Sequence, residues 1–407
     1  MKRRDFLNLL GALGISSLAV RCKDSSDTPR AYDVLVVGAG VFGIWTASYL
    51  HRAGKRVAVI EAVGPAHSGA SSGGESRVTR CGYGDEDLYT EWACRSMAEW
   101  RALSERAALP LFHEIGVLWI HGDGEEFFDA NARMLTRHGV PFARWPAREL
   151  RTRFPVLQVA DDEAGFFEPR GGGLMARRAV QQIAVELEAE GVAFLHGKVV
   201  PIRAAGGVGG ALPSVTTAEG DLIEAEQFVF ACGPWLDRVC PDAMAGRLFV
   251  TQQDVVYFAV DRRRIGALPV WVDLPFYGLP NLEGRGFKVA NDTHGPQVDI
   301  SKMDRRVSQE AETQARSLLA HRFPSIAESP LSETRVCQYE NSSNGDFVLD
   351  RHPGLENVWL AGCGSGHGFK HGPAVGAHLA GLVLGTEKTI ARFSRGSKQT
   401  RQKRAIQ

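Results

Sequence analysis

Three glycines and one acid have the spacing of a dinucleotide-binding site. Gly38, Gly40 and Gly43 form the pattern G-x-G-x-x-G, and Glu61 follows Gly43 by 18 residues. Gly38 permits a tight turn, Gly40 lets the backbone approach a pyrophosphate, and Gly43 lets a helix pack closely on a strand. A carboxylate at Glu61 can accept hydrogen bonds from an adenosine ribose and would repel a 2′-phosphate, which argues against NADP.

The residues around these glycines predict the strand–helix–strand unit that such a site needs. Residues 32–37 are apolar and β-branched, as in a buried parallel strand, and the periodicity of residues 43–54 predicts a helix. Residues 56–60 form a second apolar strand. Val41 and Phe42 complete the glycine loop and are candidate cofactor contacts. The full unit favours a dinucleotide site over a plain glycine turn, with the phosphates at the helix N-terminus.

Composition indicates a globular protein that binds a small molecule. The chain has 407 residues, of which 44% are hydrophobic, enough for a large core and two domains. Lysine plus arginine equals aspartate plus glutamate, at 47 each, so no net charge directs the chain to nucleic acid. The polar segment 389–407 is rich in lysine and arginine, and we expect it to be a disordered, solvated tail.

The first 30 residues predict a signal segment and linker. Their start resembles a twin-arginine export signal, Lys2-Arg3-Arg4-Asp5-Phe6-Leu7, and the apolar stretch at 9–20 is too short to span a bilayer. We therefore expect a periplasmic protein that takes up its cofactor before export. The alternative is an ordinary basic N-terminus on a cytoplasmic protein. Arg21 precedes Cys22, where lipid-attachment sites need a small residue, so a lipid anchor is disfavoured.

The seven cysteines indicate neither a disulfide framework nor a metal site. No pair has C-x-x-C spacing, and no cysteine lies at metal-ligand spacing from others. The odd number leaves at least one thiol free.

The remaining segments predict an α/β fold in which the nucleotide-binding domain is discontinuous. Residues 71–80 are small and polar and should form a loop over the cofactor, whereas 88–103 and 176–190 have helical periodicity. Strands of the parallel sheet are expected at 192–195, 227–233 and 358–362. Strands at 114–121, 248–258 and 286–289 and around Trp271 predict a second, α+β domain with an antiparallel-rich sheet.

With these pieces in order, the chain resembles the monomeric sarcosine oxidase and N-methyltryptophan oxidase group of the D-amino-acid-oxidase-like flavoproteins. The resemblance covers Ala31 to about Lys388 and includes Phe167-Glu168-Pro169-Arg170-Gly171-Gly172 and Ala231-Cys232-Gly233-Pro234-Trp235. It implies a Rossmann-like FAD-binding domain and a separate substrate domain in a monomer. The corresponding ranges are 31–110, 163–244 and 335–388 for the FAD-binding domain, and 111–162 and 245–334 for the substrate domain.

The resemblance also implies covalent flavin. Arg335-Val336-Cys337-Gln338-Tyr339 is similar to the segment in which that group joins FAD, through a cysteine sulfur, to the flavin 8-methyl carbon. The alternative is that Cys337 is a small buried hydrophobe.

A second glycine loop matches the flavin end of the group's site. The loop runs into a helix near Pro373, whose N-terminus would stabilise anionic reduced flavin. The resemblance implies five cofactor contacts in this loop: Gly364, Gly366, His367, Gly368 and Phe369. Lys370 matches the lysine that, with an arginine, holds the substrate carboxylate; the alternative is a surface lysine.

Two arginines match a pair beside the flavin. Arg80 is the expected carboxylate clamp, because a guanidinium binds a carboxylate bidentately, and Arg77 is expected over the flavin ring. Ser76 stands where the group has a cofactor-binding threonine, and Gly73 where it has a histidine.

Three further residues match the substrate pocket. Tyr277 corresponds to a pocket tyrosine, and Lys288 to a lysine that promotes reaction with O₂, since a fixed cation stabilises the charge that develops on oxygen. Lys288 could instead face solvent. Asp292 replaces a pocket histidine, which favours a larger or more basic N-alkyl amino acid over sarcosine; it could also lie in an exposed turn with Asn291.

The implied reaction is oxidation of a secondary amino acid, N-methyl or N-alkyl, to an imine. Hydride passes to flavin N5 and O₂ reoxidises the flavin, which gives hydrogen peroxide. Two alternatives remain: a flavin-dependent amino acid or amine dehydrogenase that passes electrons to a carrier, and a flavin-binding protein without turnover.

Overall fold

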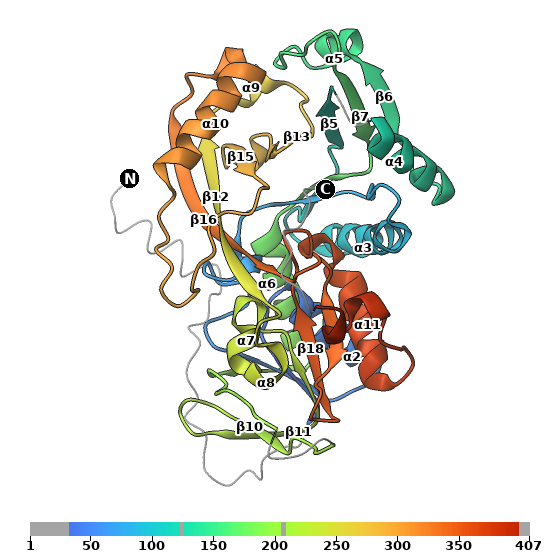
Figure 1. Ribbon diagram of the computed structural model, residues 1–407, viewed down its shortest axis with the longest axis vertical. Helices are drawn as coiled ribbons and strands as arrows, with labels where there is room; N and C mark the ends of the chain where they lie inside the picture. Colours follow the sequence, from blue (N-terminus) through green and yellow to red (C-terminus); the bar gives the residue numbers. More distant parts are fainter. Residues whose placement is uncertain (1–31, 123–124, 205–208, 399–407) are drawn as a thin grey trace. The chain divides into compact units, whose positions relative to one another are not determined.

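The computed structural model describes residues 32–122, 125–204 and 209–398, whose strands form three sheets (Figure 1). The predicted export signal, Cys22 and the last nine residues lie outside these ranges. Within the described ranges, no helix combines the length and the apolar character needed to cross a membrane.

The seven-stranded sheet is the predicted nucleotide-binding sheet. Its order is β17-β18-β11-β1-β2-β9, with β10 paired to β11. The path from β18 to β9 is parallel, and β17 is antiparallel to β18. Val36 lies between Val59 and Val229 and is fully buried, as the apolar runs predict. The strands are β1 (Tyr32–Val37), β2 (Val57–Glu61), β9 (Ala193–His196), β10 (Ser214–Thr216), β11 (Leu222–Phe230), β17 (Val348–Arg351) and β18 (Val358–Gly362).

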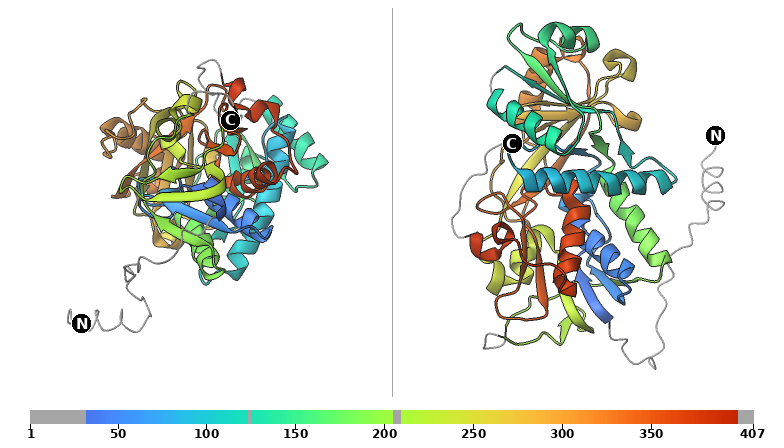
Figure 2. Two further views of the ribbon diagram at one scale, coloured as in Figure 1. Left: turned by 90° about the horizontal axis from the view of Figure 1, so that it is seen from below. Right: turned by 90° about the vertical axis from the view of Figure 1, so that its right-hand side faces the viewer.

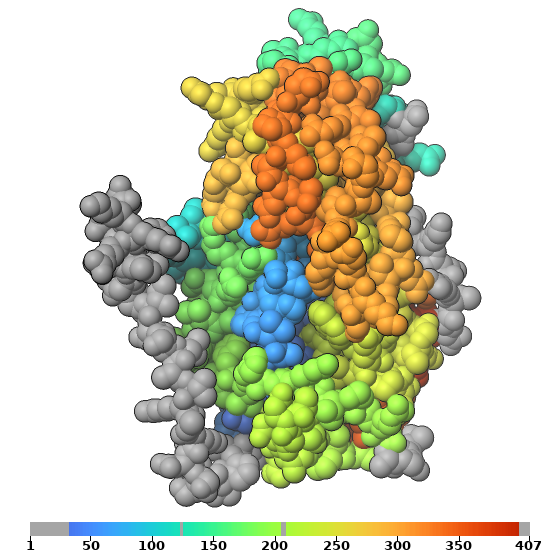
Figure 3. All heavy atoms as spheres, turned by 90° about the vertical axis from the view of Figure 1, so that its left-hand side faces the viewer, coloured from blue at the N-terminus to red at the C-terminus, as the bar shows by residue number. Residues whose placement is uncertain are grey.

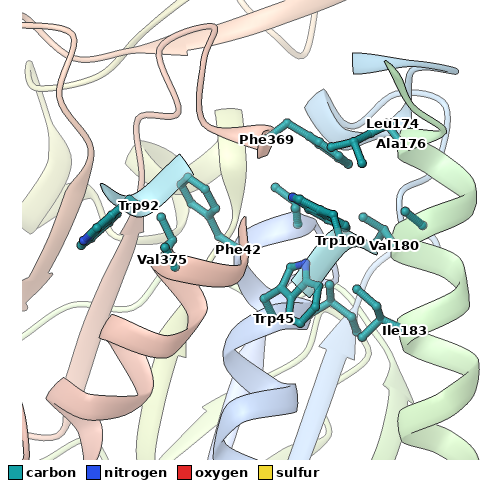
Figure 4. Close-up of a cluster of buried hydrophobic side chains, with 14 of the residues drawn as sticks. Phe42, Trp45, Trp92, Trp100, Leu174, Ala176, Val180, Ile183, Phe369 and Val375 are labelled. Atoms are coloured by element: carbon teal, nitrogen blue, oxygen red, sulfur yellow. The ribbon is translucent and has the colours of Figure 1, made fainter. Parts of the chain in front are cut away.

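Four helices pack on this sheet or against one another. They are α2 (Val41–Arg52), α3 (Asp87–Arg106), α6 (Ala176–Ala189) and α11 (Gly372–Leu384). Trp45 of α2 contacts Trp100 of α3 edge to face at 5.3 Å, and Trp100 stacks on Phe369 at 5.5 Å (Figure 4). A Cβ on Gly376 would lie 2.6 Å from Trp45, so α11 approaches α2 closely only because that residue is glycine. In the right panel of Figure 2, α3 runs across the end of α11.

The eight-stranded sheet is mostly antiparallel, as predicted for the second domain. Its order is β16-β12-β15-β14-β13-β5-β7-β6, and only β13 and β5 are parallel. The strands are β5 (Val117–His121), β6 (Ala143–Pro146), β7 (Ala164–Glu168), β12 (Phe249–Phe258), β13 (Val270–Asp273), β14 (Phe276–Leu279), β15 (Phe287–Asn291) and β16 (Leu331–Asn341). β7 and residues 335–341 of β16 therefore pair outside the nucleotide-binding sheet, although 163–244 and 335–388 were assigned to the FAD-binding domain. The domain boundaries themselves stay predictions.

A small sheet and short helices complete the described chain. The small sheet has the order β3-β8-β4, made of β3 (Arg77–Thr79), β4 (Phe112–His113) and β8 (Gly172–Leu174). The remaining α-helices are α4 (Glu125–Arg137), α5 (Ala147–Arg153), α7 (Leu236–Val239), α8 (Pro241–Met244), α9 (Arg262–Ile265) and α10 (Gln309–Arg322). The 3₁₀ turns are η1 (Ser71–Gly73), η2 (Gly233–Trp235), η3 (Leu282–Gly284), η4 (Pro324–Ile326), η5 (Phe369–His371), η6 (Ala391–Phe393) and η7 (Arg395–Ser397).

The prediction of a disordered tail is wrong for residues 389–398. Phe393 is fully buried in the main core, and Arg392 pairs with Glu86 at 2.6 Å and with Asp346 at 2.8 Å. Lys398 is also buried, and burial lowers its pKa to about 8. The basic composition of this segment gave no sign of these partners, because they lie far away in the sequence.

Candidate active site

A cavity of about 530 Å³ opens at the carboxyl ends of the parallel strands, where doubly wound folds bind ligands. It also meets η1 and β16, and η1 packs against both α6 and β16. In Figure 3 the segment around η1, in blue, reaches the surface between the green and orange segments. The predicted cofactor residues that line the cavity are Gly38, Gly40, Val41, Phe42, Glu61, Arg77, Gly364, Gly366, Gly368 and Phe369.

The three motif glycines have separate roles. Gly38 has a φ of +104°, and a Cβ there would lie 2.5 Å from the Ala231 carbonyl oxygen. A Cβ on Gly43 would lie 2.0 Å from the Gly38 carbonyl oxygen, so Gly43 serves helix packing and does not line the cavity. A Cβ on Gly40 would meet only the Ser72 hydroxyl, at 3.5 Å. The space beside Gly40 is therefore open for a ligand.

Glu61 links the glycine loop to the second strand. One carboxylate oxygen accepts the Ala39 N–H at 2.8 Å, and the other accepts the Val63 N–H at 3.1 Å. Glu61 also lines the cavity, which agrees with a ribose contact.

His367 and Lys370 of the second glycine loop both contact Tyr83. His367 is buried, with Nδ1 3.2 Å from the Tyr83 hydroxyl and Nε2 3.1 Å from the Gly345 carbonyl oxygen. Neither His367 nor Lys370 lines the cavity, so their direct cofactor contact stays a prediction. The rest of the loop, with Gly366 at a φ of +80°, does line it.

Arg80 and Lys370 meet at one aromatic ring. The Arg80 guanidinium lies 4.7 Å and the Lys370 Nζ 4.9 Å from the centroid of Tyr83. Lys370 Nζ also donates to the Tyr83 hydroxyl at 2.6 Å, and Arg80 lies 4.6 Å from the Trp119 ring. Both cations are buried. Burial, and then the charges of Lys370 and Arg80, hold the pKa of His371 well below its usual range, so His371 is neutral and the local potential is positive.

Arg77, Cys337 and Lys288 form a second group. Arg77 Nη2 lies 3.2 Å from the Cys337 sulfur and 2.7 Å from the Ser71 carbonyl oxygen. Lys288 Nζ donates to the Ser76 carbonyl oxygen at 3.2 Å. Lys288 is only 1% exposed, so the solvent-facing interpretation is wrong. Burial, and then the charge of Arg77, lowers the pKa of Lys288 to about 7.

Tyr277 and Asp292 extend this group. Lys288 Nζ lies 5.2 Å from the Tyr277 ring, and the Tyr339 hydroxyl donates to Asp292 Oδ1 at 2.8 Å. Asp292 is half-buried, so the exposed-turn interpretation is also wrong. Burial, and then the charge of Asp292, raises the pKa of both Tyr277 and Tyr339.

Three site residues were not predicted. Tyr83 joins the two clamp cations, Tyr339 holds Asp292, and Glu340 places a buried carboxyl at the cavity. The only sequence signals were that Tyr83 follows Arg80 by three residues and that Tyr339 and Glu340 continue the strand of Cys337. Cys337 itself contacts the cavity-lining Arg77 but does not line the cavity.

Comparison with known proteins decides the family. Residues 33–382 match the family described as FAD dependent oxidoreductase. The chain belongs to this family. This FAD-dependent oxidoreductase is 29% identical over 377 residues to monomeric sarcosine oxidase of Bacillus sp. (strain NS-129), covering 89% of this chain and 96% of that protein. It is 26% identical over 351 residues to N-methyl-L-tryptophan oxidase of Yersinia pestis (strain Pestoides F), covering 85% and 93%. These matches confirm the predicted resemblance.

The fold comparison agrees with the family. L-proline dehydrogenase from P. horikoshii superposes with a TM-score of 0.76 at 22% sequence identity, covering 90% of this chain and 98% of that chain. The predicted architecture, a Rossmann-like FAD-binding domain with an antiparallel-rich second domain, is thereby confirmed as the fold of this oxidoreductase.

The cavity of this FAD-dependent oxidoreductase fits its cofactor. Gly40 leaves room beside the N-terminus of α2, where a pyrophosphate would bind, and Glu61 lies at the carboxyl end of β2 for a ribose. The cavity also presents buried polar atoms for which the described residues supply no hydrogen-bond partner, among them Ser71 Oγ and Glu340 Oε2. In the described ranges, no cluster of His, Cys, Asp and Glu could hold a metal ion.

Proposed function

We propose that this protein oxidises a secondary amino acid, N-methyl or N-alkyl, to an imine, with O₂ as electron acceptor and hydrogen peroxide as product. FAD, when bound, supplies the redox chemistry: it accepts a hydride from the carbon next to the amine nitrogen and passes two electrons to O₂. The chain's own residues bind and orient the substrate, hold charges near it and exclude water.

The observation that carries the proposal is the pair of buried cations at Tyr83. Arg80 and Lys370 come from distant segments, yet both lie within 5 Å of the Tyr83 ring. The charges of Lys370 and Arg80 make the local potential positive, as the lowered pKa of His371 indicates, and a positive site suits an anion such as an α-carboxylate. Fixing that carboxylate orients the α-amine and the adjacent C–H bond, and positioning of this kind lowers a barrier by several kcal/mol.

Lys288 supports oxygen as the acceptor. Its Nζ is buried and fixed at the Ser76 carbonyl oxygen, and it changes charge near pH 7. A fixed cation in a low-dielectric site stabilises negative charge that develops on oxygen more than the same cation does in water. A dehydrogenase that uses a protein carrier has no need of such a group.

The contact between Arg77 and Cys337 supports a covalent link to FAD. The Arg77 guanidinium donates to the Cys337 sulfur and fixes its position beside the cavity that Arg77 lines. In the proposed link the cysteine loses its proton, a sulfur–carbon bond replaces one C–H bond of the flavin 8-methyl group, and two electrons pass to O₂.

Asp292 supports a substrate larger or more basic than sarcosine. Its carboxylate lies near Tyr277 and Tyr339, and the Tyr339 hydroxyl donates to its Oδ1. A carboxylate there attracts a second cationic group of the substrate or favours a more basic amine.

The deciding experiment is anaerobic bleaching of the flavin. Purified protein is mixed under nitrogen with N-methyl, N-alkyl, cyclic and free α-amino acids, including members with a basic side chain, and air is then admitted. We expect bleaching by a secondary amino acid and rapid return of colour with peroxide. Bleaching with slow recolouring would establish a dehydrogenase, and no bleaching at all would remove the amino-acid assignment.

Export and a monomeric state belong to the same proposal. The twin-arginine pattern at Arg3 and Arg4 supports periplasmic localisation, and cell fractionation of the Arg3→Lys/Arg4→Lys double variant tests it, because the double variant should stay in the cytoplasm. The name of the Bacillus relative supports a monomer, which sedimentation of the purified protein can check.

A further inference from the structure

Glu340 is a buried carboxyl group at the wall of the cofactor cavity. It lies near the end of β16, three residues after Cys337, and its residue surface is 8% exposed. Its Oε1 accepts the Gly364 N–H at 3.4 Å, whereas Oε2 has no hydrogen-bond partner in the described part of the chain. The Glu340 carbonyl oxygen accepts the Ser365 N–H at 2.9 Å, which fixes the strand against the second glycine loop.

The carboxyl faces both glycine segments that follow parallel strands. A Cβ on Gly233 would lie 3.5 Å from Oε2, and a Cβ on Gly364 would lie 3.6 Å from Oε1. Gly233, Gly364 and Glu340 all line the cavity. Because both positions are glycine, neither residue places a side chain over the carboxyl.

Glu61 and Glu340 are both cavity carboxyls, but their partners differ. Both oxygens of Glu61 accept backbone N–H groups. Glu340 has one backbone donor, and in the described ranges no Lys, Arg or His forms an ion pair with it. Burial raises the pKa of Glu340 to about 8, so it is protonated at neutral pH. A protonated carboxyl can donate one hydrogen bond, and it does not repel an anionic dinucleotide.

In the described part of the chain, the charge of Glu340 acts on two thiols. Cys232 precedes η2 and Cys363 follows β18, and burial, with the charge of Glu340 as a smaller contribution, raises the pKa of each above its usual range. β12 places the apolar Val250 opposite Glu340, and its strand neighbours Tyr339 and Asn341 carry no charge at neutral pH.

We propose that Glu340 is a cofactor-positioning residue: as a neutral acid it accepts the Gly364 N–H through Oε1 and donates its own O–H from Oε2 to an acceptor atom of bound FAD. This inference rests on family membership and on the cavity, and is independent of the substrate. Its test measures FAD binding without any substrate, so failure of the oxidase proposal does not affect it.

The test compares Glu340→Gln with Glu340→Met. Glutamine keeps an acceptor and a donor in the same shape, whereas methionine keeps the volume without a donor. All variants carry Cys337→Ser, so that FAD exchanges freely. The control is Asp237→Asn, because Asp237 is a second carboxyl whose pKa is raised by burial but which does not line the cavity. FAD affinity is measured by titration of FAD-free protein at pH 6 to 10.

We expect Glu340→Gln to retain FAD affinity and Glu340→Met to lose about tenfold, because an acceptor on the cofactor is then left unpaired. Affinity in the parent should fall as pH rises through about 8, where the acid ionises, and this fall should disappear in Glu340→Gln. Asp237→Asn should behave as the parent. Equal affinity in Glu340→Met and parent, or equal loss in Glu340→Gln and Glu340→Met, would overturn the proposal.

Spectroscopy of the bound cofactor identifies the acceptor. If the acceptor is the pyrophosphate, its ³¹P resonances should shift as pH passes through about 8 in the parent and not in Glu340→Gln. If it is the flavin, the visible absorption should shift in the same way. A parent in which neither signal responds would also overturn the proposal.

Discussion

The guanidinium of Arg77 lies 3.2 Å from the sulfur of Cys337, across a sequence separation of 260 residues. Arg77 belongs to β3 and lines the cofactor cavity, while Cys337 belongs to β16 of the eight-stranded sheet. The contact therefore holds the Cys337 sulfur of β16 beside a residue of the cofactor cavity, as the proposed covalent link requires.

Replacement of Cys337 by serine should leave FAD bound without a covalent bond. Acid precipitation should then release all yellow colour to the supernatant, whereas the parent protein should keep its colour in the pellet. Cys232→Ser is the matched control, because Cys232 lines the cavity but does not contact Arg77. Colour retained by Cys337→Ser and lost by Cys232→Ser would move the link to Cys232.

Replacement of Arg80 by alanine should lower kcat/KM about 100-fold, chiefly through KM, because a charge-assisted, bidentate contact to the substrate carboxylate is removed. Arg80→Lys should recover only part of the loss, since an ammonium lacks the planar fork. The control is the exposed Arg133→Ala, with steady-state kinetics as the measurement. An unchanged KM in Arg80→Ala would exclude Arg80 from the clamp.

Replacement of Tyr83 by phenylalanine should distinguish the role of its hydroxyl from that of its ring. The ring contact to Arg80 is kept, but Lys370 Nζ loses its 2.6 Å acceptor, so we expect KM for the substrate to rise about tenfold. Tyr89→Phe is the control, because the Tyr89 hydroxyl donates to Asp346 at 2.8 Å. If both variants raise KM equally, Tyr83 has no special part in the clamp.

The rate of flavin reoxidation by O₂ should fall as pH rises through about 7. Lys288 has a pKa of about 7 in the folded protein, so its stabilising charge is present below that pH and lost above it. Lys288→Met should be slow at all pH values and show no such step, whereas the exposed Lys302→Met should match the parent. Stopped-flow mixing of reduced protein with oxygen measures this, and a Lys288→Met profile that retains the step would assign it to another group.

Gly43→Ala should lower the stability of the FAD-free protein, whereas Gly40→Ala should weaken FAD binding. Gly43→Ala places a methyl group against the Gly38 carbonyl oxygen and should cost roughly 3 kcal/mol of unfolding free energy in FAD-free protein. Gly40 has a φ of −75° and open space beside it, so Gly40→Ala should leave that stability within about 0.5 kcal/mol of the parent but weaken FAD binding. Gly210→Ala is the control, because a Cβ on Gly210 would meet no atom within 4 Å. A stable Gly43→Ala variant would contradict the assigned packing role.

The sequence by itself determined the parts of this protein that depend on neighbours along the chain. The strand–helix–strand unit, the three glycine roles and the second glycine loop all follow from periodicity and from backbone freedom, which act over a few residues. For the same reason β1, β2, β9, β11 and β18 of one large sheet and β5, β12, β13 and β15 of the other were predicted near their observed positions, whereas β16, which carries Cys337, was not predicted. The motif alone was enough to indicate a dinucleotide.

Only the tertiary structure decided which side chains share a site. Whether Lys288 was buried, and whether Asp292 lay in an exposed turn, depended on strands far away in the sequence. Tyr83 became the meeting point of Arg80 and Lys370 through a contact across 287 residues. Glu340 became a buried cavity carboxyl because Gly233 and Gly364 approach it, and Arg392 became ordered because Glu86 and Asp346 pair with it. Burial and charge pairing act through space, so the order of residues along the chain does not reveal them.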